Sequence, residues 1–192
     1  MASYAVKPLN EETWPDFADL VERHNGVWGG CWCLEFHPEG NQRGADRRAL
    51  KELRVRDGAA HAALVFDGDV CVGWCQFGTP DELPRIKFGR AYREAASDPP
   101  DWRITCFFVD KSYRHQGVAA AALKGALREI AGLGGGTVES SPEDVEGRKV
   151  SSSFLYNASV AMFERQGFTR TRQLGKNNWL VTRKVRPSRV SS

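Results

Sequence analysis

The residues best suited to chemistry lie between Ile104 and Ala119, where an apolar run ends in a short polar turn and a glycine. The run predicts a strand, and the apolar spacing that starts at Gly117 predicts a helix. A strand-to-helix turn directs free backbone N–H groups and the positive end of the helix dipole to one point. Gly117 allows a ligand to approach the backbone, and Arg114 adds a positive charge. The segment therefore predicts a phosphate-binding loop.

This segment resembles the acetyl-CoA signature R/Q-x-x-G-x-G/A of the GNAT (GCN5-related N-acetyltransferase) superfamily. Residues 114–119 read Arg-His-Gln-Gly-Val-Ala, and the preceding Phe-Phe-Val-Asp also matches. A second match is Val160–Phe168, which is similar to the helix ending in Gly-Phe near the C-terminus of the family. The resemblance covers Tyr4 to Val185. Two other phosphate motifs, G-x-G-x-x-G and G-x-x-x-x-G-K-[ST], are absent.

The resemblance implies one α/β domain over residues 1–185 and a basic tail over residues 186–192. The sheet would be mixed and mostly antiparallel, flanked by helices and splayed at the strand that precedes the loop. Acetyl-CoA would be the acyl donor, with no metal. The implied donor-binding residues for the pantetheine are Phe108 and Val109. Those implied for the pyrophosphate are Arg114, His115, Gln116, Gly117, Val118 and Ala119. Asn157 is added because it lies one residue after the position at which the family commonly has an asparagine.

The proton donor departs from the family pattern. The family often uses a tyrosine to protonate the leaving thiolate, and Phe163 stands at that position. Tyr156 lies seven residues earlier on a helix predicted over Phe154–Gln166, so both side chains would project from nearly the same face. We expect Tyr156 to be the nearest replacement. Capping the helix or packing against adenine is the alternative role for Tyr156.

The acceptor would lie near the segment Cys31–His37, which reads as a strand. Its period of two places Cys31, Cys33, Glu35 and His37 on one face. By the resemblance this region walls the acceptor pocket, and Glu35 or His37 would remove the proton of the acceptor. The alternative is that the thiols are small buried apolar groups and that Glu35 and His37 are solvated.

Two further candidates belong to the same region. Glu139, on the strand after the loop helix, would line the other side of the splay as a second candidate base; an exposed strand-end carboxylate is the alternative. A metal site formed by Cys31, Cys33 and His37, with Cys71 or Cys75 as a further ligand, is not expected, because neither C-x-C nor C-x-x-x-C is a structural zinc spacing.

The remaining elements must position these groups. Tyr4–Leu9 predicts a strand, and helices are expected from Asn10 to about His24 and over Asp46–Arg56. The runs Ala60–Phe66 and Val70–Phe77 flank Asp67-Gly68-Asp69 and predict an antiparallel hairpin. Thr79–Pro100 predicts a loop with a short helix. The later expected elements are a strand over Trp102–Asp110, a helix from Gly117 to about Leu133 and strands over Thr137–Ser140, Phe168–Leu174 and Trp179–Val185.

Composition sets the class of protein. The 192 residues carry 27 basic and 24 acidic side chains, a net charge of +3 that is too balanced to indicate nucleic-acid binding. Residues 1–12 do not have the pattern of a secretory leader, and no apolar run is long enough to span a bilayer. Five scattered cysteines indicate reduced thiols. We therefore expect a cytoplasmic protein without a membrane partner.

The sequence thus predicts an N-acetyltransferase that moves an acetyl group from acetyl-CoA to a primary amine of a small molecule or peptide by direct attack. Two alternatives are a non-catalytic acyl-CoA sensor or binding module, and an acetyltransferase of aminoacyl-tRNA, for which the charge is weak support. A nucleic-acid partner is not expected, and a homodimer is left open.

Overall fold

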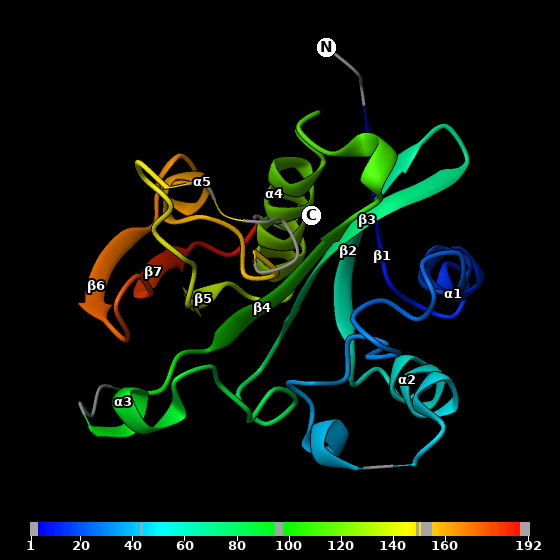
Figure 1. Cartoon of the computed structure of the whole chain (residues 1–192), viewed down its shortest axis with the longest axis horizontal. Helices are drawn as coiled ribbons and strands as arrows, with labels where there is room; N and C mark the ends of the chain where they lie inside the picture. The colour runs from blue at the N-terminus through cyan, green and yellow to red at the C-terminus, as the bar shows by residue number, and fades with distance from the viewer. Residues whose placement is uncertain (1–3, 43, 95–97, 149, 151–154, 189–192) are drawn as a thin grey trace.

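The computed structural model describes residues 4–42, 44–94, 98–148, 150 and 155–188. Within these residues the chain forms one seven-stranded sheet in the order β1-β2-β3-β4-β5-β7-β6 (Figure 1). The strands are β1 (Ala5–Pro8), β2 (His61–Asp67), β3 (Val70–Gly78), β4 (Trp102–Val109), β5 (Gly136–Ser140), β6 (Thr169–Gln173) and β7 (Trp179–Val185). The helices are α1 (Trp14–Glu22), α2 (Arg47–Arg56), α3 (Gly89–Glu94), α4 (Val118–Gly132) and α5 (Val160–Glu164), with 3-10 turns η1 (Pro38–Asn41) and η2 (Lys111–Tyr113).

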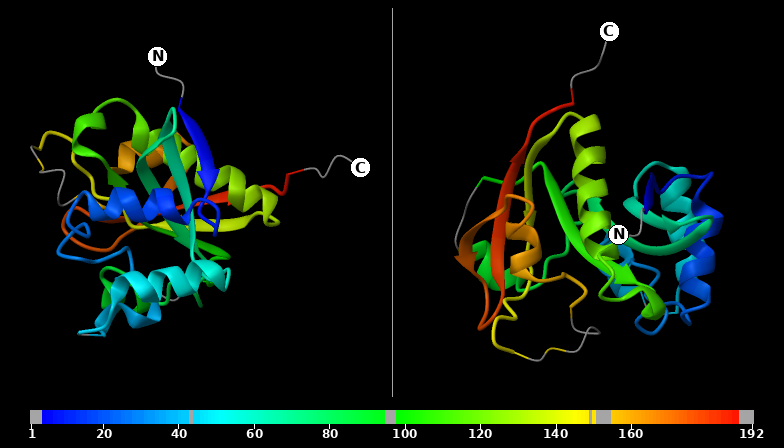
Figure 2. Two further views of the ribbon diagram at one scale, coloured as in Figure 1. Left: turned by 90° about the vertical axis from the view of Figure 1, so that its right-hand side faces the viewer. Right: turned by 90° about the horizontal axis from the view of Figure 1, so that it is seen from above.

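The sheet is covered on both faces, which explains why its central strands are apolar almost throughout. Along β2, Ala63 and Val65 face the core under α4 and α5, whereas Leu64 and Phe66 face the core under α1 and α2. This alternation is the period of two of an extended strand. Figure 2 shows α1 and α2 gathered on the side of the molecule opposite α5.

Most predicted elements are confirmed within a few residues. The predicted hairpin is β2 and β3, which pair antiparallel across a turn in which Gly68 has a φ of +57°. The helix predicted from Asn10 begins later, at Trp14, because Asn10 and Thr13 form a turn of their own. In that turn the N–H of Thr13 donates to Asn10 Oδ1 at 3.1 Å. Of the predicted tail, residues 189–192 lie outside the described residues.

The longest helix, α4, lies close to the sheet because it carries a glycine at the contact. A Cβ on Gly125 would lie 2.4 Å from Val6 Cγ1 and 3.2 Å from Ala63 Cβ. The apolar stripe of the helix, including Leu123 and Ile130, is buried against the sheet. Gly125 therefore sets the distance between α4 and strands β1 and β2.

The pairing beside β4 is uneven, and this positions the site. On one side β4 pairs antiparallel with β3 over most of its length. On the other side it pairs with β5, in the one parallel register among the described strands, over Trp102–Ile104 alone. Further along, the N–H of Phe107 donates to the carbonyl of Tyr156 at 2.6 Å. The mixed, mostly antiparallel sheet is confirmed, and the splay beside β4 stays a prediction.

Candidate active site

The predicted phosphate loop lies between β4 and α4 and borders a cavity of about 440 Å³. We call it the loop cavity; its lining residues are Trp28, Phe107–Val109, Tyr113–His115, Gly117–Ala120, Leu155, Ala158, Ser159, Met162 and Arg165. Asp110 fixes the start of the loop, because its carboxylate accepts from Ser112 N at 3.0 Å and lies 3.0 Å from His24 Nε2. Burial acts to raise the pKa of Asp110, but these partners outweigh it and lower the pKa.

The backbone of the loop suits an anion. His115 and Gly117 both have left-handed backbones, with φ of +61° and +87°. Gly117 is the N-cap of α4 and supplies no side-chain cap, so the first N–H groups of the helix need partners from outside it. Arg114 and Arg165 line the same cavity and add positive charge. Helix amides, two arginines and no side chain at the cap are the features that suit a phosphate group.

The edge of β4 supplies further polar groups. The N–H of Phe107 is directed toward Tyr156, and that of Asp110 donates to Val72 O on β3 at 2.9 Å. Because backbone groups alternate along a strand, the N–H of Val109 is directed to the same side as that of Phe107, whereas that of Phe108 is directed toward β3. Val109 is therefore the residue whose amide faces a ligand lying along β4.

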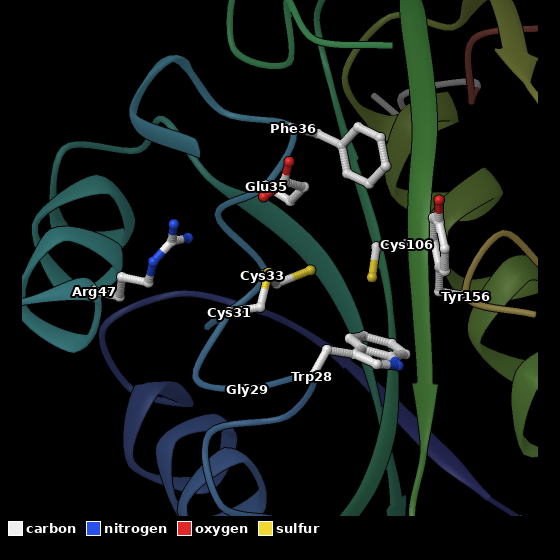
Figure 3. Close-up of a pocket in the computed structure, with 9 residues that line it drawn as sticks. All are labelled: Trp28, Gly29, Cys31, Cys33, Glu35, Phe36, Arg47, Cys106 and Tyr156. Carbon is white, nitrogen blue, oxygen red and sulfur yellow. The ribbon is translucent and has the colours of Figure 1, made fainter. Parts of the chain in front are cut away.

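A second cavity, of about 360 Å³, contains three of the five thiols. We call it the cysteine cavity, and Figure 3 shows the residues that line it, which are Trp28, Gly29, Cys31, Cys33, Glu35, Phe36, Arg47, Cys106 and Tyr156. Cys106 and Phe107 are neighbours on β4 with side chains on opposite faces of the sheet. Because Phe108, on the same face as Cys106, also lines the loop cavity, this cavity reaches both faces at the edge of the strand. Trp28 lines both cavities.

The prediction that Cys31–His37 is a strand is wrong. The segment is a series of turns in which Trp32 and Cys33 have positive φ values of 49° and 56°. Its apolar side chains are drawn into the core under α1, where Trp32 packs with Trp14 at 6.1 Å between ring centroids. The turns nevertheless direct Cys31, Cys33 and Glu35 to one cavity, as the alternation suggested.

The two candidate bases of this segment are separated. Glu35 lines the cysteine cavity and accepts from Arg85 Nη2 at 3.2 Å. His37 does not line it and is 1% exposed, with its Nε2 3.2 Å from Lys51 Nζ. Burial, together with the charges of Lys51 and Arg54, lowers the pKa of His37 to about 2. His37 is therefore a neutral, buried partner of Lys51.

Tyr156 lies in the cysteine cavity but not on a helix. Residues 151–154 of the predicted helix lie outside the described residues, and α5 begins at Val160, after Ala158 with a φ of +58° and the N-cap Ser159. The expectation that Tyr156 and Phe163 share a helical face is therefore wrong. Phe163 is fully buried under α4, whereas the Tyr156 ring packs at 6.0 Å from Trp28 and 6.2 Å from Phe36 between centroids.

Glu139 lies away from both cavities. It is 4% exposed, so the alternative of an exposed carboxylate does not hold. Arg103 Nε lies 3.0 Å from Glu139 Oε1, and the Tyr92 hydroxyl donates to the same oxygen at 2.8 Å. Sequence reasoning did not predict this buried cluster. It makes Glu139 a partner of Arg103 in the core.

Two of the predicted donor-binding residues also have partners elsewhere. Gln116 does not line the loop cavity, and its Nε2 donates to Ser112 O at 2.8 Å. Asn157 is buried, and its Nδ2 donates to the Ser141 carbonyl at 3.2 Å and to Ser141 Oγ at 3.0 Å. The structure brings the other predicted donor-binding residues, Phe108, Val109, Arg114, His115 and Gly117–Ala119, to the loop cavity.

Comparison with known proteins agrees with this geometry. A sequence profile of the acetyltransferase (GNAT) family matches residues 30–168. The chain belongs to the GNAT acetyltransferase family. No curated protein matches the chain in sequence.

Solved GNAT structures share the fold at low sequence identity. One, titled histone acetyltransferase HPA2 and related acetyltransferase, from Corynebacterium glutamicum, is 18% identical and covers 99% of both chains with a TM-score of 0.52. The ribosomal-protein-S18-alanine N-acetyltransferase of Escherichia coli is 11% identical, covers 99% of both chains and has a TM-score of 0.51. The PaiA N-acetyltransferase of Thermoplasma acidophilum, solved with coenzyme A, is 11% identical over 95% of this chain and 99% of its own, with a TM-score of 0.52.

Membership of the GNAT family makes the chain an acetyltransferase whose donor is acetyl-CoA. The loop cavity fits this donor, because it combines free helix amides, Arg114 and Arg165 with the β4 edge. Among the described residues, no group of three or more His, Cys, Asp or Glu side chains could hold a metal ion. No helix in the described part of the chain could cross a membrane.

Sequence reasoning missed several residues of this GNAT site. Arg47 and Cys106 line the cysteine cavity, and Arg165 lines the loop cavity. Trp28 follows Gly26 and Val27 in a turn of positive φ values, and the only signal for it was the glycine-rich stretch around it. Apolar residues that repeat with a period of two or 3.6 reveal strands and helices. They do not reveal such residues, because turns determine where these side chains lie.

Proposed function

We propose that this protein transfers an acetyl group from acetyl-CoA to a primary amine of a small molecule or peptide, and that the amine attacks the thioester directly. The observation that carries the proposal is the pair of cavities that both border β4 and share Trp28. The donor occupies the loop cavity and the amine occupies the cysteine cavity. The thioester lies where the two cavities meet, beside Val109 and Trp28.

The residues take the following roles. The loop from Arg114 to Ala119 binds the pyrophosphate. The N–H of Val109 stabilises the oxyanion that forms when the amine attacks the thioester carbonyl. Glu35 at the rim of the cysteine cavity accepts the proton of the amine, directly or through water. Holding both reactants beside one strand supplies a large part of the rate acceleration.

Tyr156 protonates the CoA thiolate as it leaves. Burial raises the pKa of its phenol, so the group is protonated at neutral pH and can donate. Its ring lies in the cysteine cavity, and its carbonyl is bonded to Phe107 at the edge of β4. The hydrogen bond to Phe107 therefore holds Tyr156 beside β4, the strand along which the thioester lies.

The test measures binding and turnover separately. Calorimetry with acetyl-CoA is expected to show binding in the micromolar range, and release of CoA thiol is expected with some members of a panel of primary amines and peptides. Binding without turnover on any amine would favour the acyl-CoA sensor, which the replacement of the usual tyrosine by the buried Phe163 also favours. Absence of binding would contradict the assignment of the loop cavity.

A further inference from the structure

A buried lysine lies behind the cysteine cavity without a carboxylate partner among the described residues. Lys51 of α2 is 0% exposed. Its Nζ donates to Gln76 Oε1 at 2.8 Å and lies 3.2 Å from His37 Nε2. Gln76 is neutral and in turn donates to Thr105 Oγ1 at 3.1 Å, and His37 is neutral because its pKa is about 2. A buried ammonium group with only neutral partners is costly unless an anion lies nearby.

The thiols of the cavity are the acidic groups that favour a charged Lys51. Burial lowers the pKa of Lys51, whereas the nearby Cys33, Cys106 and Cys31, in this order of influence, act to raise it. Figure 3 shows the sulfur atom of Cys33 directed toward the side chain of Cys106. If Cys33 gives its proton to Lys51, these two side chains and the Cys106 thiol together still carry no net charge.

The three thiols of the cavity differ in acidity. Burial acts to raise the pKa of Cys33, but a hydrogen bond with Cys106 and the charge of Lys51 outweigh it and lower the pKa below its usual value. The same hydrogen bond, with burial, raises the pKa of Cys106 well above its usual value. Burial also raises the pKa of Cys31. Cys33 is thus the one thiol of these three whose pKa is lowered, and the thiolate is the form that reacts.

The backbone directs this thiol into the cavity at a cost. Cys33 has a φ of +56°, a conformation that residues with a side chain rarely adopt. Trp32 and Leu34 on either side of it are buried in the core under α1 and hold the turn in place. The same turn places Cys33 opposite Cys106, one residue from the Phe107 backbone that borders the loop cavity.

We propose that Cys33 is a second acyl acceptor, which takes the acetyl group from acetyl-CoA when the cysteine cavity holds no amine. This proposal rests on the proposed function, because it requires the thioester to lie where the two cavities meet. The acceptor chemistry is that of a thiolate attacking a thioester. The modification occupies part of the cavity that an acceptor amine would use.

The step balances without any further reactant. The Cys33 sulfur forms a bond to the thioester carbonyl carbon, and the bond between that carbon and the CoA sulfur breaks. The electron pair leaves with CoA, whose thiolate takes the proton of Tyr156, and Tyr156 regains a proton from water. CoA can reverse the step by attacking the acetylated Cys33 in the same way, because one thioester is exchanged for another.

The experiment incubates the full chain with acetyl-CoA alone, blocks the remaining thiols and maps acetylated cysteines by mass spectrometry. Exposure alone would favour Cys31, which is partly exposed, over Cys33, which is 3% exposed. We expect the opposite order, with Cys33 acetylated first and the label removed by an excess of CoA. The variant Cys33→Ser is expected to lose the thioester label, and Cys31→Ser to keep it.

A second variant tests the role of the lysine. Lys51→Met keeps most of the side-chain volume and removes the charge, and we expect it to slow acetylation of Cys33 about tenfold or more, the effect of one pKa unit. Thermal melting checks that this variant is folded. If it is unfolded, the mass-spectrometric mapping of acetylated cysteines and the Cys33→Ser variant test the proposal without it.

Calorimetry on the same preparation separates the two proposals. Binding of acetyl-CoA with no label on Cys33, or with label mainly on Cys31, overturns this inference and leaves the proposed function intact. Absence of binding overturns both.

Discussion

At the scale of single residues, the donor site depends more on backbone geometry than on side chains. Gly117 lets the chain turn into α4 with a φ of +87°, so that helix amides rather than a capping side chain face the cavity. His115, two residues earlier in the chain, also has a positive φ. Only a few residue types tolerate such positions, which is why a single glycine in the sequence carried so much information.

We predict that Gly117→Val loses acetyl-CoA affinity at least tenfold while the fold persists. A Cβ at this position would meet no atom within 4 Å, so the harm comes from backbone strain, on the order of 1–3 kcal/mol, and not from a clash. Calorimetry measures the affinity. Gly58→Val is the matched control, because Gly58 has a φ of +67° with equal space at the end of α2, far from the loop in sequence. Equal affinities of both variants would refute the loop assignment.

Tyr156→Phe tests the proton donor. Removing a real general acid lowers turnover roughly 10²- to 10⁴-fold and leaves donor affinity nearly unchanged. Because the pKa of this phenol is raised, the wild-type rate should hold up to pH 10 and fall above it. Tyr92→Phe is the control, since that hydroxyl bonds to Glu139 outside both cavities. Turnover within a few-fold of wild type would assign the proton to solvent.

At the scale of elements, the contact of α4 with the sheet gives a test of packing. Gly125→Ala adds a methyl group 2.4 Å from Val6 Cγ1, and overpacking costs about 1–3 kcal/mol, more than the helix propensity of Ala returns. We expect a net loss of stability in denaturant unfolding. Gly132→Ala, in the same helix with open space around it, should gain up to about 1 kcal/mol. A stabilised Gly125→Ala protein would show that α4 can shift.

Elements with strong periodicity were predictable from the sequence, and elements set by turns were not. Strands β2, β3 and β4 and helix α4 carry long apolar patterns and appear close to their predicted bounds. The alternation of Cys31–His37 instead reflects a turn with positive φ values, because burial of Trp32 and Leu34 decides its path. Local caps decide α5 in the same way, since Ser159 starts it.

The candidate site was predictable to the same extent. The loop residues follow from a local motif and reach the loop cavity. Glu139 and His37 carry the right chemistry but bind Arg103 and Lys51, which lie 36 and 14 residues away along the chain. No local pattern reveals such partners. Distant contacts therefore decided which candidate acids and bases face a cavity.

At the scale of the whole molecule, one partly buried carboxyl group should shape the pH dependence of stability. Burial raises the pKa of Glu129 on α4 from 4.5 to about 8. The folded state therefore holds a proton that the unfolded state releases, and stability falls as pH rises from about 4.5 to about 8. Glu129→Gln should show a smaller drop in melting temperature between pH 5 and pH 9 than wild type. Glu12→Gln, at an exposed position, should leave that drop unchanged; an equal drop in all three proteins would refute this role for Glu129.

We expect the short parallel pairing of β4 with β5 to divide the sheet into two cooperative units. The antiparallel registers within β1–β4 and within β5, β7 and β6 have four to seven residue pairs, whereas three pairs connect the two groups. Amide hydrogen exchange should therefore show the C-terminal strands opening together, at a lower free energy than the N-terminal ones. In the proposed function the donor lies along this boundary, so its binding should slow exchange in both units at once and couple their unfolding.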